Sequence, residues 1–280
     1  MSPPPLSARY STAFVTGAST GLGLAFTEML LAEGVAVWGT SRDAARVPKR
    51  DRLHPVALEL GDGPGAERVF LEADAAAGGF DLVINNAGFG VFGGFAQTDW
   101  SAWEAQVEMM LLNTARISHA ALRGMLARRR GALVNISSLA AEFALPYQAA
   151  YNMAKSGLSA LNESLMYELR GTGVIVIDFR PGDYRTDFER SVRRAPADPS
   201  RSAGAAAGRA ERAWAAFAKM MRSAPPPAHA AASLRRALHR GRSGTVRTGR
   251  FFQATVAPLL ARLGSQALRR GIQERYFGLR

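Results

Sequence analysis

The first two-thirds of the chain alternates short apolar runs with longer helical patterns, and this alternation limits the possible folds more than any other feature. Six runs have the composition of β-strands; they cover residues 11–17, 34–41, 54–60, 81–88, 131–138 and 173–182. Helical periodicity fills intervals between them, for example at 23–34 and 100–130. Near-continuous apolar strands separated by helices are typical of a parallel sheet covered on both faces. The sequence therefore predicts an α/β fold with a doubly wound parallel sheet.

Length and composition limit what the chain can do. With 280 residues, 48% hydrophobic and 21% charged, we expect one domain that spans 1–280. Cysteine is absent, which excludes disulfides and thiolate sites, and four scattered histidines give no ligand spacing, so we expect no metal site. The first residues lack a leader pattern, and no apolar stretch reaches the roughly 20 residues of a membrane span. We expect a cytoplasmic protein.

The positive charge of the chain is concentrated near its C-terminus. Residues 234–280 hold eleven arginines and one acid, which is +10 of the net charge of +12. We expect a basic helical extension at about 233–280, outside the main fold. It is either a solvated cap or, because Phe and Leu lie among the arginines, a surface for peripheral contact with anionic membranes. Nucleic-acid binding is not expected, because no recognised module accompanies the charge.

Residues 183–232 differ in composition from the chain before them. They are rich in Ala, Pro, Ser and Gly, with a helical pattern inside. A segment of this kind after a late strand is either a lid over the substrate or a plain surface loop.

A glycine-rich turn joins the first strand to the first helix. Its glycines are Gly17, Gly21 and Gly23 in TGASTGLG. At a strand–helix junction, glycines permit a tight turn and let a pyrophosphate approach the helix N-terminus. The turn predicts a Rossmann-like dinucleotide site. The second strand ends in Ser41-Arg42 with no acid there, and arginine binds a 2′-phosphate, so we expect NADP(H) in preference to NAD(H).

Six motifs in order resemble the short-chain dehydrogenase/reductase family, in its single-domain branch, over residues 11–186. They are TGASTGLG, NNAG at 85–88, Asn113 in MMLLN, NISS ending at Ser138, YNMAK at 151–155, and PGDYRT at 181–186. NNAGFGVFG is also similar to the version in hydroxysteroid and retinol dehydrogenases. Three positions depart from the family pattern: Glu59 replaces a shorter adenine-contacting aspartate, Ala141 replaces a glycine often found three residues after the serine, and Asp183 stands where small or apolar residues are usual.

The resemblance implies roles for particular residues. The catalytic set would be Asn113, Ser138, Tyr151 and Lys155. The residues expected to bind the cofactor, besides Tyr151 and Lys155, are Gly17, Ser19, Thr20, Gly21, Leu22, Gly23, Ser41, Arg42, Glu59, Leu60, Asn86, Ala87, Gly88, Pro181, Gly182 and Thr186. The residues expected to bind the substrate are Phe89, Phe92, Phe143, Tyr147 and Tyr184.

The implied chemistry is proton exchange through a tyrosine. Tyr151 would give a proton to a carbonyl as hydride arrives, or remove it in reverse. The ordinary tyrosine pKa near 10 is too high for this at neutral pH, so we expect the Lys155 ammonium, one helical turn away, to lower it by about three units. The aromatic loops 89–95 and 142–147 favour a small-to-medium apolar hydroxyl or carbonyl compound, steroid-, retinoid- or aldehyde/ketone-like.

The interpretation is an NADP-dependent oxidoreductase acting on CH–OH groups, assembled as a homodimer or homotetramer. Two alternatives remain: an epimerase or dehydratase that uses the same Tyr–Lys pair, and a non-catalytic NADP-binding regulatory protein.

Overall fold

A seven-stranded parallel sheet forms the centre of the molecule, as seen in a computed structural model that describes residues 3–186, 188–194, 205–259 and 264–279. The strand order is β3-β2-β1-β4-β6-β7-β9, and every neighbouring pair is parallel. The strands are β1 (Thr12–Val15), β2 (Ala36–Ser41), β3 (Leu53–Ala57), β4 (Leu82–Asn85), β6 (Gly131–Ile136), β7 (Val174–Pro181) and β9 (Gly244–Thr248).

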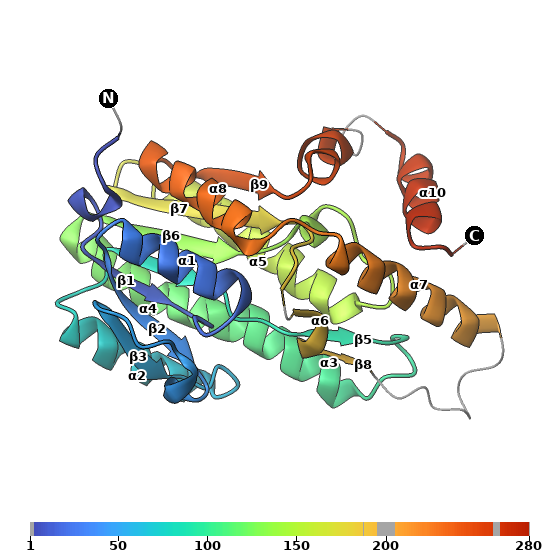
Figure 1. Ribbon diagram of the computed structural model, residues 1–280, viewed down its shortest axis with the longest axis horizontal. Helices are drawn as coiled ribbons and strands as arrows, with labels where there is room; N and C mark the ends of the chain where they lie inside the picture. Colours follow the sequence, from blue (N-terminus) through green and yellow to red (C-terminus); the bar gives the residue numbers. More distant parts are fainter. Residues whose placement is uncertain (1–2, 187, 195–204, 260–263, 280) are drawn as a thin grey trace.

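Helices cover both faces of this sheet (Figure 1). The helices are α1 (Gly21–Ala32), α2 (Gly63–Ala76), α3 (Trp100–Val107), α4 (Asn113–Arg128), α5 (Ala149–Glu168), α6 (Phe188–Ser191), α7 (Ala205–Arg222), α8 (Pro227–Arg240) and α10 (Gln266–Tyr276). Helices α1 and α8 pack together on one face, and α2, α4 and α5 lie on the other. The doubly wound fold predicted from the sequence is confirmed.

Alternation along each strand divides the core into two layers. In β1, Ala13 and Val15 belong to the cluster under α1 and α8, whereas Phe14 faces α2 and α4. In β4, Ile84 and Val83 divide in the same way. Successive side chains of a strand point to opposite faces, so a sheet buried on both sides needs apolar residues at every position. This requirement explains the near-continuous apolar strands of the sequence.

The C-terminal segment contributes to the sheet as well as extending beyond it. Helical structure is present at α8 and α10, but β9 lies between them as an edge strand hydrogen-bonded to β7. Arg235 and Arg247 form ion pairs with Glu33 and Glu142 of the main fold. The expectation that the basic segment lies outside the main fold is therefore wrong for residues 233–248, which complete the α1 layer and the sheet.

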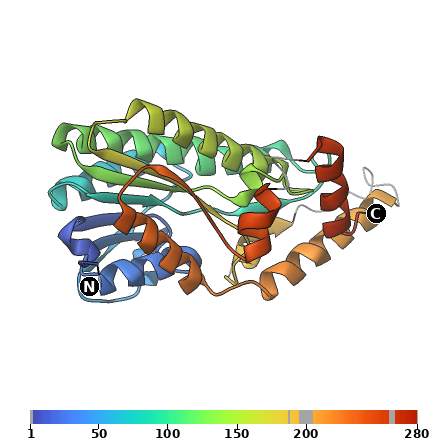
Figure 2. The same ribbon diagram turned by 90° about the horizontal axis from the view of Figure 1, so that it is seen from above.

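Three segments gather beyond the carboxyl ends of the strands. A two-stranded sheet pairs β5 (Gly90–Phe92) with β8 (Val192–Arg194). Helix α7 carries Phe217 and Met221 into a small cluster with Phe92 and Val192. Helix α10 stands beside α7 at the same end of the molecule (Figures 1 and 2). The predicted lid falls partly on residues 187 and 195–204, which lie outside the described residues, and it stays a prediction.

Candidate active site

The strand order reverses between β1 and β4, and the site lies at this point. Strand β1 has β2 on one side and β4 on the other, so the connections from these neighbours leave in opposite directions. The crevice at such a switch point, outside the carboxyl ends of the strands, is where doubly wound sheets bind ligands. A cavity of about 970 Å³ occupies this place and is lined by the turn after β1 and the loop after β4.

The glycine turn forms one wall of the crevice. Gly17 and Gly21 adopt positive φ values of 70° and 58°, which side chains rarely tolerate. A Cβ at Gly23 would lie 2.1 Å from the carbonyl oxygen of Gly17. Helix α1 begins at Gly21 without a side-chain cap from the described residues, so its first N–H groups are available to an anion. The cradle fits the pyrophosphate of a nicotinamide dinucleotide.

The loop after β4 is fastened to this turn through Thr16. The Thr16 hydroxyl oxygen accepts hydrogen bonds from the backbone N–H groups of Asn86 (2.9 Å) and Ala87 (3.0 Å). The Asn86 amide in return donates to the Thr16 carbonyl at 3.0 Å. These contacts fix the separation of the two walls of the crevice, which a rigid cofactor site requires.

One face of α5 carries the reactive side chains toward the sheet. Tyr151, Lys155, Ser159 and Asn162 recur at intervals of three or four residues, so they share a face of the helix. Lys155 is 5% exposed; its Nζ donates to the Ile136 carbonyl at 2.7 Å and lies 5.8 Å from the centre of the Tyr151 ring. The helix thus brings the Tyr–Lys pair to the carboxyl end of β6.

Burial controls the proton equilibria of this pair. Burial raises the pKa of Tyr151 to about 12; the hydrogen bond with Ser138 opposes this shift, and the nearby charge of Asp183 adds to it. Burial also lowers the pKa of Lys155 to about 8, against the attraction of Asp178. The pKa of Tyr151 is therefore raised in the protein alone and not lowered as expected, and desolvation is the largest cause.

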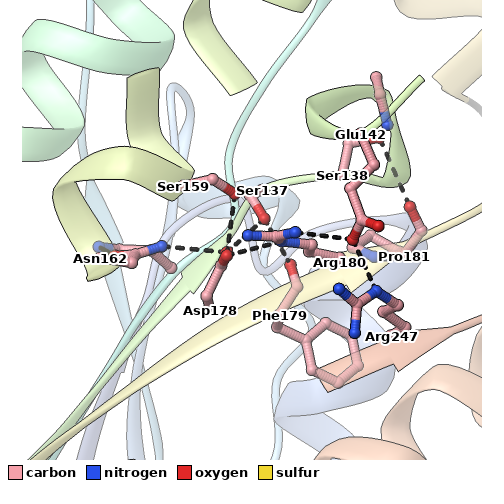
Figure 3. Close-up of polar contacts among 12 residues, drawn as sticks. Ser137, Ser138, Glu142, Ser159, Asn162, Asp178, Phe179, Arg180, Pro181 and Arg247 are labelled. Atoms are coloured by element: carbon pink, nitrogen blue, oxygen red, sulfur yellow. Dashed lines mark hydrogen bonds and ion pairs between the residues drawn. The ribbon is translucent and has the colours of Figure 1, made fainter. Parts of the chain in front are cut away.

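A buried polar network lies behind Ser138 (Figure 3). Asp178 of β7 is 1% exposed and accepts hydrogen bonds from Ser137 (2.5 Å), Ser159 (2.9 Å), Asn162 (3.1 Å) and the Nε of Arg180 (2.7 Å). The network ties α5 and the end of β6 to β7, and it compensates a carboxylate that would be costly to bury alone.

Arg180 extends this network into the turn that follows Ser138. Its Nη1 lies 2.6 Å from Oε1 of Glu142, and the same oxygen lies 2.6 Å from Nε of Arg247 on β9 (Figure 3). The Ser138 hydroxyl itself accepts from the Ala140 N–H at 3.1 Å and faces the Pro181 carbonyl at 3.5 Å. Glu142 therefore holds the serine turn against two strands.

Most residues expected at the site line the cavity of about 970 Å³. Among those assigned to the cofactor, the exception is Gly23, which lies beneath the turn. Asn113 is also absent from the lining; its amide donates to the Leu60 carbonyl at 2.7 Å. The expected residues in the lining are Gly17, Ser19, Thr20, Gly21, Leu22, Ser41, Arg42, Glu59, Leu60, Asn86, Ala87, Gly88, Phe89, Ser138, Phe143, Tyr151, Lys155, Pro181, Gly182, Tyr184 and Thr186.

Two aromatic residues expected to bind substrate lie elsewhere. The Phe92 ring packs against Tyr147 and Trp214 in the cluster under α7, and neither Phe92 nor Tyr147 lines the cavity. Tyr184 does line it, but its hydroxyl hydrogen-bonds His229 (2.8 Å) and Thr248 (2.7 Å). These three aromatics stabilise the walls of the site.

The cavity also contains residues that sequence reasoning missed. Arg46 lines the cavity together with Arg42. Its place four residues after Arg42 in the sequence could have indicated a second phosphate-binding arginine. Gln253 and three residues of α10, Leu268, Ile272 and Tyr276, close the opposite end. No local pattern marks these four, because they reach the site through the path of the C-terminal segment.

Comparisons with known proteins match this geometry. The family model described as short chain dehydrogenase covers residues 11–197. An uncharacterized oxidoreductase of Myxococcus xanthus is 35% identical over 190 residues, which is 64% of this chain and 74% of that protein. A short-chain dehydrogenase structure from Streptomyces avermitilis has a TM-score of 0.77 and 27% identity, covering 94% of this chain and 95% of that one.

Solved structures similar to this chain contain both forms of the cofactor. A metagenomic short-chain oxidoreductase in complex with NADP has 33% identity and a TM-score of 0.59, over 62% of this chain and 83% of that one. A short chain dehydrogenase/reductase from Burkholderia phymatum in complex with NAD has a TM-score of 0.76 over 95% of each chain, at 20% identity, and shows the shared fold alone.

Proposed function

The chain belongs to the short-chain dehydrogenase family and is an NAD(P)-dependent oxidoreductase of CH–OH groups, and we propose that it uses NADP(H) to interconvert a hydroxyl and a carbonyl on a small-to-medium apolar substrate. One observation carries the proposal. A single cavity joins the glycine turn to the Tyr151 hydroxyl and continues to an apolar wall. Cofactor and substrate can therefore meet at a proton donor that is partly buried.

Tyr151, Ser138 and Lys155 have separate roles in the proposed reaction. The bound dinucleotide supplies or receives hydride. The Tyr151 hydroxyl gives its proton to the carbonyl oxygen, and Ser138, which hydrogen-bonds Tyr151, holds that oxygen in place. Lys155 keeps most of its positive charge at neutral pH because its pKa is about 8. That charge favours the tyrosinate left after proton transfer.

The raised pKa of Tyr151 supports its proposed role as the acid in carbonyl reduction. Burial raises the pKa of Tyr151 to about 12, so the hydroxyl keeps its proton at neutral pH and is ready to act as an acid. Removal of a proton from an alcohol requires the deprotonated form, which is scarce there. Asn113 is proposed to order the neighbouring loop through its hydrogen bond to the Leu60 carbonyl, because its side chain lies outside the cavity lining.

Two arginines support the preference for NADP(H). Arg42 and Arg46 line the cavity next to Ser41, the last residue of β2. In this fold that position faces the adenosine ribose, where a 2′-phosphate makes bidentate contacts with arginine. The metagenomic relative solved with NADP, at 33% identity, is consistent with this assignment.

The cavity wall supports an apolar substrate. Phe89 and Phe143 come from the loops after β4 and β6, and Phe217, Leu268 and Ile272 come from α7 and α10. Burial of an apolar body against these side chains contributes about 25 cal/mol for each Å² removed from water. Steroid-, retinoid- and ketone-like compounds are the proposed classes.

We also propose that the protein contacts the surface of membranes and that it forms a homodimer or homotetramer. Phe251 and Phe252 are 74% and 49% exposed, beside Arg250 and near the cavity. Apolar side chains among arginines favour binding to anionic lipid. None of the described helices is long and apolar enough to cross a membrane.

Purified protein with a panel of ketones and aldehydes tests the proposal. We expect NADPH oxidation by several apolar carbonyl compounds, with much slower NADH oxidation, and no turnover in a Lys155→Met control. An epimerase or dehydratase would convert substrate without net NADPH loss. A regulatory protein would bind NADPH tightly and oxidise none with any carbonyl compound.

A further inference from the structure

Asp183 is the one acidic residue among the described lining that stands beside the proposed proton donor. It follows Pro181 and Gly182 at the end of β7, lines the cavity, and its charge acts on Tyr151. Glu59, the other acid of the described lining, belongs to the loop after β3 at the cofactor end. The proposed chemistry of Tyr151, Ser138 and Lys155 does not require a carboxylate at this place.

The C-terminal segment orients this carboxylate. Gln253 donates a hydrogen bond from Nε2 to Oδ2 of Asp183 at 2.5 Å, and the same nitrogen lies 3.1 Å from the Tyr276 hydroxyl of α10. Oε1 of Gln253 is buried and has no partner among the described residues. An oriented carboxylate and an unsatisfied amide oxygen, both acceptors, therefore lie in the wall.

No cation neutralises Asp183 at contact distance. Among the described residues it forms no ion pair within 4 Å, and Arg250 acts on it only from farther away. Burial raises the pKa of Asp183, while the hydrogen bond from Gln253 and the charge of Arg250 oppose the shift. Asp183 is partly exposed in the cavity wall, so an apolar ligand bound there would remove water from its carboxylate, and a donor on the ligand would offset that cost.

The surroundings make this polar position selective. Apolar side chains elsewhere in the lining of the same cavity include Phe217, Met220 and Ile272, which offer no hydrogen-bond donor. A ligand of purely apolar character would leave Asp183 unsatisfied, whereas one with a hydroxyl or ammonium group would satisfy it. Sites built around a hydrogen bond to substrate reject analogues that lack the group.

We propose that Asp183, oriented by Gln253, is a specificity-determining residue that selects carbonyl substrates carrying a second group able to donate a hydrogen bond, a hydroxyl or a protonated amine, on an otherwise apolar body. The inference rests on the proposed function and narrows its substrate class. A donor bound at Asp183 would also offset the charge that opposes ionisation of Tyr151, and so would couple recognition to proton transfer.

Matched ketones test the inference. Acetophenone and propiophenone are compared with derivatives that carry a hydroxyl or an amine on the alkyl arm, by kcat/KM for NADPH oxidation. We expect wild type to prefer the donor-bearing ketones at least tenfold. Asp183→Asn should reduce the preference for the amine-bearing ketones by about ten- to a hundredfold, as loss of a hydrogen bond to a charged group does. Asp51→Asn, at an exposed acid outside the cavity, is the control.

Two substitutions of Asp183 distinguish a hydroxyl donor from an amine donor. A hydroxyl can still donate to the asparagine oxygen, so Asp183→Asn should spare part of the hydroxyl preference and remove the amine preference. Asp183→Leu should remove both. Equal wild-type kcat/KM for parent and donor-bearing ketones, or equal losses for all ketones in Asp183→Asn, would overturn the inference.

Failure of the proposed function gives a different result. If no ketone oxidises NADPH, the reaction assignment fails. The Asp183 subsite is then tested by calorimetric titration of the protein with 1-phenylethanol, 1-phenylethane-1,2-diol and 2-amino-1-phenylethanol in separate experiments. Tighter binding of the last two by wild type, lost in Asp183→Leu, supports the subsite. Equal binding of all three overturns it, and this wild-type comparison decides even if a variant does not fold.

Discussion

At the residue scale, the Tyr151 hydroxyl is the group on which the proposed chemistry depends. It lies one helical turn before Lys155, hydrogen-bonds Ser138, and is shielded enough for burial to raise its pKa to about 12. An exposed Tyr–Lys pair would have neither property. The combination of burial and specific partners distinguishes this pair from the same spacing on a solvated helix.

We expect Tyr151→Phe to remove most turnover while the protein still folds and binds NADPH. The substitution deletes one hydroxyl, and general acid catalysis contributes about 10²–10⁴-fold. Single-turnover hydride transfer with an accepted ketone measures the loss. Because the deprotonated tyrosine is the base for alcohol oxidation, the wild-type oxidation rate should also rise through the alkaline range, and this rise should vanish in Tyr151→Phe. Transfer near the wild-type rate in the variant would exclude Tyr151 as the proton donor.

The proposed cofactor preference also rests on single residues. Arg42→Ala should weaken NADPH binding roughly ten- to a hundredfold, because a charge-assisted hydrogen bond to phosphate contributes about 1.5–3 kcal/mol. Arg46→Ala should have a smaller effect in the same direction, and NADH affinity should barely move. Fluorescence titration with both cofactors measures this, with Arg50→Ala, outside the cavity lining, as control. A wild-type preference for NADH, or equal loss of both cofactors, would refute the assignment.

At the scale of elements, the site depends on how three strands and a turn are joined. Glu142, in the turn after Ser138, lies 2.6 Å from both Arg180 of β7 and Arg247 of β9. Burial alone would raise the pKa of Glu142, but the hydrogen bonds and charges of these arginines outweigh it and hold the pKa below its ordinary value. The fold therefore stabilises the ionised carboxylate.

We expect Glu142→Gln to lower the free energy of unfolding by about 3 kcal/mol, because Arg247 loses the carboxylate of Glu142 and Arg180 keeps only that of Asp178. Because the pKa of Glu142 is lowered in the folded protein, its contribution to the free energy of unfolding is complete above the ordinary pKa of 4.5. This contribution is lost as the pH falls below that value. Denaturant unfolding from pH 7 to pH 3 should show the difference between wild type and variant shrinking.

Glu67→Gln is the matched control for this prediction. Glu67 pairs with Arg116 at 3.2 Å on the surface, where an ion pair contributes roughly 0–1 kcal/mol. Two results would argue against the role given to Glu142: a loss no larger than the control, or a difference that stays constant down to pH 3.

At the scale of the whole molecule, the C-terminal segment both completes the fold and closes the site. Strand β9 adds the last position of the sheet, and α10 then places Leu268 and Ile272 in the cavity wall. The same segment exposes Phe251 and Phe252. Exposed aromatics next to the cavity are suited to a surface from which an apolar substrate would enter.

We expect the protein to co-sediment with vesicles of phosphatidylserine and phosphatidylcholine at low salt and to release at high salt, because arginines supply an attraction that salt screens. Replacement of Phe251 and Phe252 by serine should weaken binding further by removing the inserted apolar area. Tyr167→Ser, at a residue 72% exposed on α5, is the control. Binding that is insensitive to both salt and the double substitution would rule out this surface.

The sequence by itself determined the features that depend on neighbours along the chain. Six of the seven strands of the central sheet follow from apolar runs, and the glycine turn follows from the need for positive φ at Gly17 and Gly21. The alignment of Tyr151 and Lys155 follows from the helical repeat. Each of these is a local requirement, so a short stretch of sequence is enough to state it.

Only the tertiary structure decided what depends on distant contacts. Strand β9, GTVRT, has no apolar run, and as an edge strand it is defined by its backbone hydrogen bonds to β7. Phe92 and Tyr147 lie outside the cavity lining, because the Phe92 ring packs against Tyr147 and against Trp214 of α7. The pKa of Tyr151 rose because burial is set by every element around a side chain. Desolvation and packing sum over the whole surroundings of a residue, and segments far apart in the sequence supply those surroundings.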